Sequence, residues 1–206
     1  MSVAAIVLAA GASQRLGRSK QNIVLNGETL LHRALRVARE ASLSPIIVVI
    51  RSGSEYGDIR DADHVIVAMN HDADEGLASS IRCGIQVASS CGVSGAVLVT
   101  CDQPALRANH LRALVDDESR VTGSSYAGSI GIPAYFPARS FPLLLQLRGD
   151  TGARKLLVDA HAVTAEDLRL DIDTEQDLTV ARALFEPDQS NQREPLRRKL
   201  SQKLFE

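Results

Sequence analysis

Residues 3–20 read VAAIVLAAGASQRLGRSK, and this stretch sets the architecture of the whole chain. Its first part, residues 3–10, is an unbroken aliphatic run, which is typical of a strand buried on both faces in a parallel sheet. The run has no basic leader and is far too short to span a membrane. Small residues follow, together with the basic side chains of Arg15 and Lys20. The stretch therefore predicts a buried strand that ends in a loop able to hold an anion.

Similar aliphatic runs alternate with helical patterns through the first half of the chain. The further runs are residues 46–50, 65–68 and 96–100. Between them, residues 30–38 and 77–88 carry apolar side chains at helical spacing. Alternation of this kind predicts a doubly wound α/β fold. We expect a three-layer α/β/α sandwich around a Rossmann-like, mostly parallel sheet.

The second half of the chain has a less regular pattern. We expect two short strands around a turn in residues 124–136 and helices in residues 141–147 and 152–160. Residues 162–170 should lead back to the sheet, and residues 174–185 should form a final helix. Thr174 is placed to cap the last helix, with Asp177 in its first turn. After Pro187 the composition becomes polar and basic. We therefore expect one domain in residues 1–186 and an appended tail in residues 187–206.

Composition excludes several classes of partner and site. The chain has 206 residues, of which 45% are hydrophobic and 23% charged, as is ordinary for a globular domain. A formal charge of −2 gives no overall attraction to nucleic acid or to an acidic membrane surface, so any anion must be held by a local site. Three cysteines and five histidines show neither a disulfide framework nor the spacing of a metal centre.

Three polar clusters follow predicted strands, where ligands bind in open parallel sheets. The first is the loop of residues 11–20, whose backbone N–H groups and basic side chains suit phosphate oxygens. Its glycine spacing matches neither the dinucleotide fingerprint G-x-G-x-x-G nor the Walker A loop, which ends in G-K-[ST]. A basic, glycine-containing surface loop is the alternative interpretation.

The other two clusters supply carboxylates. Asp102 leaves the strand of residues 96–100 and precedes a proline, a position from which it can hold Mg²⁺ beside phosphates. A turn or helix-capping aspartate is the alternative. If residues 171–173 form a strand, Asp171 and Asp173 share one face, and Asp173 becomes a second metal ligand. A pair of carboxylates that favour the start of a helix is the alternative for this segment.

Taken in order, these motifs resemble the MobA-like nucleotidyltransferases and, within them, the molybdenum cofactor cytidylyltransferases. The opening loop matches the pattern L-A-[AG]-G-x-S-x-R-[MFL]-G-x-x-K at every fixed position. Further matches are Asn70, EGLASSIRCG at 75–84, DQP at 102–104, Gly131, Pro133 and Phe136, GDTGA at 149–153, and residues 171–177. The resemblance covers residues 3–185 and implies the fold of the nucleotide-diphospho-sugar transferases.

The resemblance also implies a role for each matched residue. Nucleotide contacts are expected from Leu8, Ala9, Ala10, Gly11, Asn70, Gly76, Ser79 and Ser80. Arg15 and Lys20 should contact the phosphates and, with Asp102, serve catalysis. Asp102 and Asp173 should hold Mg²⁺, with Mn²⁺ as an alternative. The acceptor side is expected at a turn formed by Gly131 and Pro133 and at Gly149, Asp150 and Gly152.

Family subtypes differ in the nucleobase that they use. Ala10 and the segment GLASSIR at 76–82 match the members that use CTP, whereas L-A-G-G is more frequent in those that use GTP. The sequence departs from the family pattern at two places. Residues 129–133, SIGIP, lack the Arg or Asn of many relatives, which leaves the acceptor open, and Glu175 replaces a proline.

The resemblance therefore implies a cytoplasmic enzyme that transfers CMP from CTP to the phosphate of molybdopterin and releases pyrophosphate. A molybdoenzyme or its maturation chaperone is a further partner, which the basic tail can dock; nucleic acid and membranes are not expected partners. The alternatives are an enzyme of the same fold that uses GTP or another phosphorylated acceptor, such as a sugar phosphate or phospholactate, and a nucleotide-binding module without catalysis.

Overall fold

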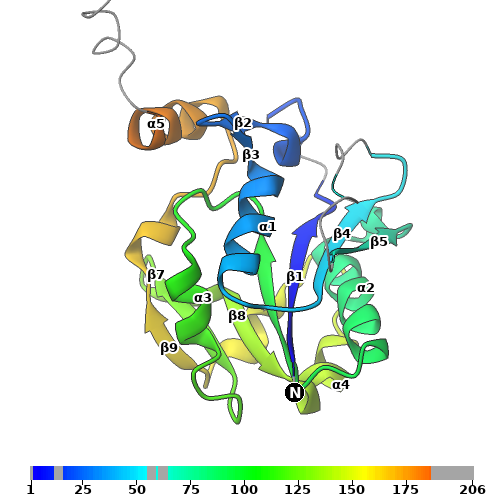
Figure 1. The fold of residues 1–206 in the computed structure, drawn as a ribbon. Helices are drawn as coiled ribbons and strands as arrows, with labels where there is room; N and C mark the ends of the chain where they lie inside the picture. The colour runs from blue at the N-terminus through cyan, green and yellow to red at the C-terminus, as the bar shows by residue number, and fades with distance from the viewer. Residues whose placement is uncertain (1, 12–15, 55–58, 60–64, 187–206) are drawn as a thin grey trace, which may run out of the picture.

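A mixed β-sheet lies at the centre of the protein (Figure 1). In the residues that the computed structural model describes, 2–11, 16–54, 59 and 65–186, this sheet has seven strands in the order β5-β4-β1-β6-β8-β7-β9. They are β1 (Val3–Ala9), β4 (Ile46–Arg51), β5 (Val65–Asn70), β6 (Gly95–Thr100), β7 (Thr122–Tyr126), β8 (Ser129–Pro137) and β9 (His161–Thr164). The strands β5, β4, β1 and β6 are parallel, as are β7 and β9, while β8 runs antiparallel to its two neighbours. The predicted mostly parallel sheet is confirmed.

Helices cover both faces of the sheet and complete the three predicted layers. The main helices are α1 (Leu30–Glu40), α2 (Leu77–Ser90), α3 (Ala108–Leu114) and α4 (Phe141–Leu144). One core cluster contains side chains of α1 and α3, and the other contains those of α2 and α4. Figure 1 shows α1 and α2 on opposite sides of β1. Along β1, Val7 packs into the first cluster while Ile6 and Leu8 pack into the second, as expected for a strand buried on both faces.

A third, smaller cluster lies at the end of the molecule toward which β1 points. It joins the hairpin of β2 (Val24–Leu25) and β3 (Glu28–Thr29) to α5 (Glu175–Phe185), which Figure 1 shows beside that hairpin. Thr174 caps α5, because its Oγ1 accepts a hydrogen bond from the backbone N–H of Asp177. The Asp177 carboxylate accepts in return from the N–H of Thr174, which completes a capping box. The prediction for this helix is confirmed.

Several boundaries in the second half differ from the prediction. The helix predicted for 141–147 is a single turn, α4, preceded by the 3₁₀ segment η3 (Ala138–Ser140), and the one predicted for 152–160 is the 3₁₀ segment η4 (Ala153–Leu157). After β9 the chain forms a further 3₁₀ turn, η5 (Glu166–Arg169). Short 3₁₀ turns lack the extended apolar periodicity that a sequence pattern detects. The tail predicted for 187–206 lies outside the described residues.

Two short 3₁₀ segments precede α1 and α2, namely η1 (Lys20–Asn22) and η2 (Ala73–Glu75). Both lie near the carboxyl ends of parallel strands, since η1 follows the β1 loop and η2 follows β5. Across the part of the chain that the structure describes, none of the helices combines the length and the apolar character that a bilayer crossing requires.

Candidate active site

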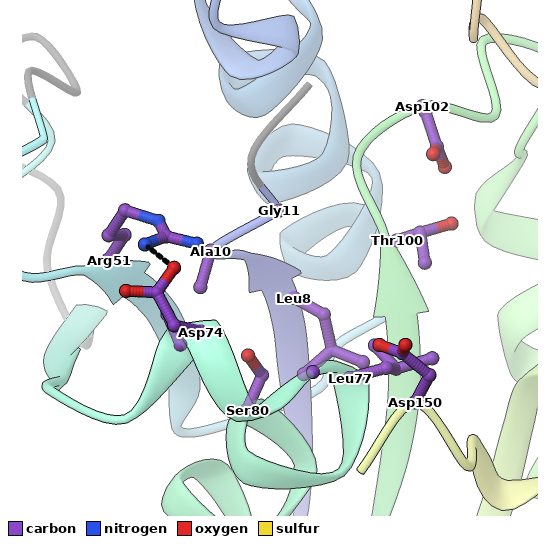
Figure 2. Close-up of a pocket in the computed structure, with 12 residues that line it drawn as sticks. Leu8, Ala10, Gly11, Arg51, Asp74, Leu77, Ser80, Thr100, Asp102 and Asp150 are labelled. Atoms are coloured by element: carbon purple, nitrogen blue, oxygen red, sulfur yellow. Dashed lines mark hydrogen bonds and ion pairs between the residues drawn. The ribbon is translucent and has the colours of Figure 1, made fainter. Parts of the chain in front are cut away.

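The order of the strands creates a crevice beyond the carboxyl ends of β1 and β6. The chain passes from β1 through α1 to β4 on one side, and it returns through α2 to β6 on the other side. Ligands bind at such a switch point in open α/β sheets. A cavity of about 500 Å³ lies there, which is within the usual range for small-molecule sites. Seven of the predicted site residues line it (Figure 2): Leu8, Ala10, Gly11, Gly76, Ser80, Asp102 and Asp150.

The end of β1 forms one wall of this cavity. Leu8 and Ala10 are buried and belong to the core cluster on the α2 side of the sheet. Ala9 alternates with them, packs into the opposite cluster and does not line the cavity. Gly11 is exposed, and a Cβ added to it would meet no atom within 4 Å. A ligand can therefore lie directly against the backbone of this segment.

The first turn of α2 forms the facing wall, and Asn70 fixes it from behind. The Asn70 side chain is only 4% exposed, and its Nδ2 donates to Ser79 Oγ at 2.8 Å and to Ser80 Oγ at 3.0 Å. Ser79 Oγ in turn donates to the carbonyl of Gly76 at 2.8 Å. Both N–H groups of the Asn70 amide are therefore engaged by α2. The structure places Asn70 and Ser79 behind the cavity wall and Ser80 in it.

A loop between α4 and η4 closes one side of the cavity and is fastened to α2. The backbone N–H of Gly149 donates to Glu75 Oε1 at 3.2 Å, while its carbonyl accepts from the N–H of Ala78 at 3.1 Å. Arg82 holds Glu75 through a two-point ion pair and also donates to the carbonyl of Leu147 at 2.7 Å. Hydrogen bonds from Arg82 are the main reason that the pKa of Glu75 falls to about 2. Glu75 and Arg82 belong to matched sequence motifs that gave neither residue an individual contact, and the structure shows that they position this loop.

Close packing of glycines lets this loop approach α2. Gly76 has φ +117°, and a Cβ built on it would lie 2.3 Å from Asp150 Oδ1 and 2.7 Å from the carbonyl of Gly149. A Cβ on Gly152 would lie 3.1 Å from Leu77 Cδ2. A larger residue at 76 would push the loop outward and move Asp150, which lines the cavity.

Lys20 brings two distant carboxylates together at the other side of the crevice. Its Nζ lies 3.3 Å from Asp102 Oδ2 and forms a second ion pair with Asp173 Oδ1. The side chains of Lys20, Asp102 and Asp173 are 17%, 22% and 38% exposed. Residues from three separate segments therefore converge on one positive charge, as the sequence analysis expected.

The backbone determines this convergence. The N–H of Ile172 donates to the carbonyl of Asp102 at 2.9 Å, which ties the two acidic segments together. Asp173 follows immediately, and its N–H donates to Asp177 Oδ2 at 3.2 Å as part of the α5 cap. Residues 171–173 do not form a strand, so the condition under which Asp171 and Asp173 would share one face of a strand is not met. The side chains still alternate between core and site, because Ile172 is buried in the third cluster while its neighbours on either side are acidic.

The local electrostatics favour a bound cation. Burial alone would lower the pKa of Lys20, but the carboxylates of Asp102 and Asp173 outweigh it and raise the pKa above its ordinary value. Burial, followed by repulsion from Asp102, raises the pKa of Asp171 to about 6. In the described segments no three His, Cys, Asp or Glu side chains form a metal cluster. Two carboxylates nevertheless suit Mg²⁺, which takes one or two carboxylates and keeps water and substrate phosphates as its other ligands.

The predicted acceptor residues divide into two groups. Asp150 lines the cavity with the loop of residues 149–152 around it, whereas Gly131 and Pro133 belong to β8 and do not line it. The prediction of a turn at residues 131–133 is wrong. The β7–β8 hairpin turns instead at Ala127 and Gly128, where φ is positive at both positions. Gly131 instead leaves room for the Tyr126 hydroxyl, which a Cβ would approach to 3.0 Å.

The basic groups near the site were predicted only in part. Arg15 lies outside the described residues. Arg51, at the end of β4, was not singled out by sequence, yet it lines the cavity and pairs with Asp74 at 2.7 Å (Figure 2). Arg18 forms an exposed ion pair with Glu175 at 2.6 Å. A single arginine at the end of a strand carries no local pattern, so nothing in the sequence indicated Arg51.

A doubly wound sheet with a glycine-containing loop, a paired lysine and two carboxylates at the switch point is compatible with a nucleotidyltransferase. The sequence model of the MobA-like NTP transferase domain matches residues 5–164. The chain therefore belongs to the MobA-like NTP transferase family, as the motifs indicated.

Two relatives in sequence illustrate the range of names in this group. The purine catabolism protein PucB of Bacillus subtilis is 35% identical over 162 residues, which is 74% of this chain and 78% of that protein. The probable molybdenum cofactor guanylyltransferase of Opitutus terrae is 31% identical over 107 residues, which is 52% of this chain and 51% of that protein. These two names describe different processes within one family.

Solved structures share the fold over most of the chain. The homologue of Mycobacterium tuberculosis Rv0371c from Mycobacterium sp. strain JC1 is 29% identical, with a TM-score of 0.77 over 89% of this chain and 96% of that one. Rv0371c of M. tuberculosis H37Rv in complex with manganese is 24% identical, with a TM-score of 0.69 over 89% of this chain and 98% of that one.

Proposed function

We propose that the protein transfers CMP from CTP to the phosphate of molybdopterin, with release of pyrophosphate. The observation that carries the proposal is the convergence of Lys20, Asp102 and Asp173 beside a cavity of nucleotide size at the switch point of the sheet. Such a site combines a surface for a nucleoside with a focus of charge for phosphates and a divalent cation.

Each wall of the crevice has a role in this reaction. The backbone of residues 8–11 and the turn at Gly76 and Ser80 hold the nucleoside between them. Lys20, with Arg15 from the same loop, neutralises the triphosphate. Asp102 and Asp173 hold Mg²⁺, or Mn²⁺ as is bound in the Rv0371c complex. When bound, the metal ion neutralises charge on the phosphates.

The chemistry requires positioning more than proton transfer. An oxygen of the acceptor phosphate bonds to the α-phosphorus of CTP, the bond to the bridging α–β oxygen breaks, and its electron pair leaves with pyrophosphate. The acceptor is already an anion at neutral pH, so no strong general base is needed. Lys20 and the backbone N–H groups instead reduce the repulsion between the two anions and stabilise the leaving group.

CTP is proposed as the donor because Ala10 and the segment 76–82 match the family members that use it. GTP is the second candidate, since the Opitutus terrae relative is named a guanylyltransferase. A cytoplasmic location, and a molybdoenzyme or its chaperone as recipient of the product, belong to the same proposal.

Pyrophosphate release in the presence of Mg²⁺ and molybdopterin tests this function with CTP, GTP, ATP and UTP in parallel. We expect turnover with CTP. Release with GTP alone would move the protein to the guanylyltransferases, and none with any nucleotide would refute nucleotidyl transfer to this acceptor.

The Asp102→Ala variant tests the site itself. Loss of one well-placed stabilising group commonly lowers a rate by about 10²–10³, and we expect a loss of this size for Asp102→Ala. Asp117, which is half-buried and pairs with Arg120 before β7, provides the control, and Asp117→Ala should keep the parent rate. Activity of Asp102→Ala within tenfold of the parent would reject Asp102 as a metal ligand.

A further inference from the structure

Arg51 and Asp74 form an ion pair on the cavity wall that the proposed reaction does not use. Arg51 ends β4 and Asp74 lies in η2, and both line the cavity. The Arg51 side chain is 29% exposed, with Nη1 held by Asp74 at 2.7 Å. Its Nε atom is buried and has no hydrogen-bond partner within the described structure. A buried donor without a partner costs free energy. A ligand in the cavity can contact the exposed part of the Arg51 side chain rather than this buried atom.

The pair lies at the opposite end of the cavity from the carboxylates. Strand β1 separates β4, which ends at Arg51, from β6, which leads to Asp102. Two strand spacings amount to roughly 10 Å, about the length of a nucleoside. Figure 2 shows Arg51 and Asp74 on one side of the end of β1, with Thr100 and Asp102 on the other side. A nucleotide whose phosphates lie near Asp102 is therefore long enough for its base to reach Arg51 and Asp74.

The pair presents a hydrogen-bond donor beside an acceptor. The guanidinium only donates, and the ionised carboxylate only accepts. On cytosine, the ring atom N3 accepts while the adjacent exocyclic amino group donates. On uracil both are reversed, because N3 carries a hydrogen and O4 is a carbonyl oxygen. Cytosine complements the pair, whereas uracil opposes a donor to a donor and an acceptor to an acceptor.

We propose that Arg51 and Asp74 recognise the amino edge of the nucleobase and exclude uridine nucleotides. This inference rests on the proposed use of a nucleoside triphosphate, and it assigns a specificity-determining role to two residues that no family motif includes. A site that hydrogen-bonds its ligand discriminates against an isosteric ligand with the wrong polarity, since donors then face donors and acceptors face acceptors in the complex. CTP and UTP have nearly the same size, so they isolate this effect from shape.

Calorimetric titration of the full chain with CTP and with UTP, each with Mg²⁺, tests the proposal. We expect the parent protein to prefer CTP and Arg51→Met to reduce that preference at least tenfold. Asp74→Asn changes an almost fully exposed side chain, 92% exposed, and should also reduce it because an amide can donate or accept. Arg120→Met breaks a comparable Arg–Asp pair before β7, distant from the cavity, and should keep the parent preference.

Each outcome has one interpretation. A smaller CTP-over-UTP ratio in both site variants, with the ratio kept in Arg120→Met, supports the proposal. An unchanged ratio, an equal loss of affinity for both nucleotides, or a parent protein that binds both equally overturns it while nucleotide binding stands. A parent protein that binds neither nucleotide overturns the proposed function, and this inference with it.

Discussion

Replacing Lys20 by methionine tests whether its positive charge joins the two carboxylates. The substitution keeps an apolar stem but leaves Asp102 and Asp173 without the ammonium between them. Breaking a fully buried ion pair costs about 3–5 kcal/mol. Because these carboxylates are 22% and 38% exposed, solvent screening reduces the expected loss to about 1–2 kcal/mol. In a domain of this size that corresponds to a fall in Tm of about 2–8 °C in metal-free buffer.

The same variant should respond more strongly to metal. Mg²⁺ or Mn²⁺ no longer competes with the ammonium, so each ion should raise the Tm of Lys20→Met by more than that of the parent. Calorimetric melting with and without metal measures both effects. Arg18→Met, which removes an exposed ion pair, is the control and should change Tm little. A Lys20→Met variant with the parent Tm and the parent metal response would refute a shared cation site.

Two further expectations concern residues around the crevice. Gly76→Ala places a Cβ 2.7 Å from the Gly149 carbonyl, so the free energy of unfolding should fall by about 1–3 kcal/mol in a denaturant titration and CTP should bind more weakly. Gly92→Ala is the control, because Gly92 also has a positive φ but lies in open space, and this variant should keep the parent affinity for CTP. Equal CTP affinity in the two variants would contradict this packing. Burial raises the pKa of the Cys101 thiol to about 12. Iodoacetamide should therefore modify the exposed Cys91 in the folded protein and leave Cys101 intact. Rapid labelling of Cys101 would contradict its burial.

The first half of the fold was predictable because its pattern is local. The aliphatic run that became β1 is buried on both faces, and such a run is typical of a strand inside a parallel sheet. The loop that follows it and Asp102 after β6 were predicted to lie near each other because carboxyl ends of parallel strands share one edge. The structure places Lys20 against Asp102, as that reasoning requires.

The second half depended on contacts that no local pattern contains. Glycine and proline near 131–133 suggested a turn, but a two-residue turn at Ala127 and Gly128 was enough to reverse the chain. Asp173 reaches the site from an irregular segment, which a backbone hydrogen bond to Asp102 holds in place. The Arg51–Asp74 pair joins the end of β4 to η2 across 23 residues, so neither partner indicates the other in the sequence.

Mn²⁺ binding in the presence of CTP, followed by electron paramagnetic resonance, tests the central claim most directly. The parent protein should bind Mn²⁺ with CTP, and Asp102→Asn and Asp173→Asn should each weaken that binding at least tenfold, because each removes one charged ligand of the same ion. Asp117→Asn is the control and should bind as the parent does. Mn²⁺ affinities of both site variants within twofold of the parent would contradict a shared metal site at Asp102 and Asp173.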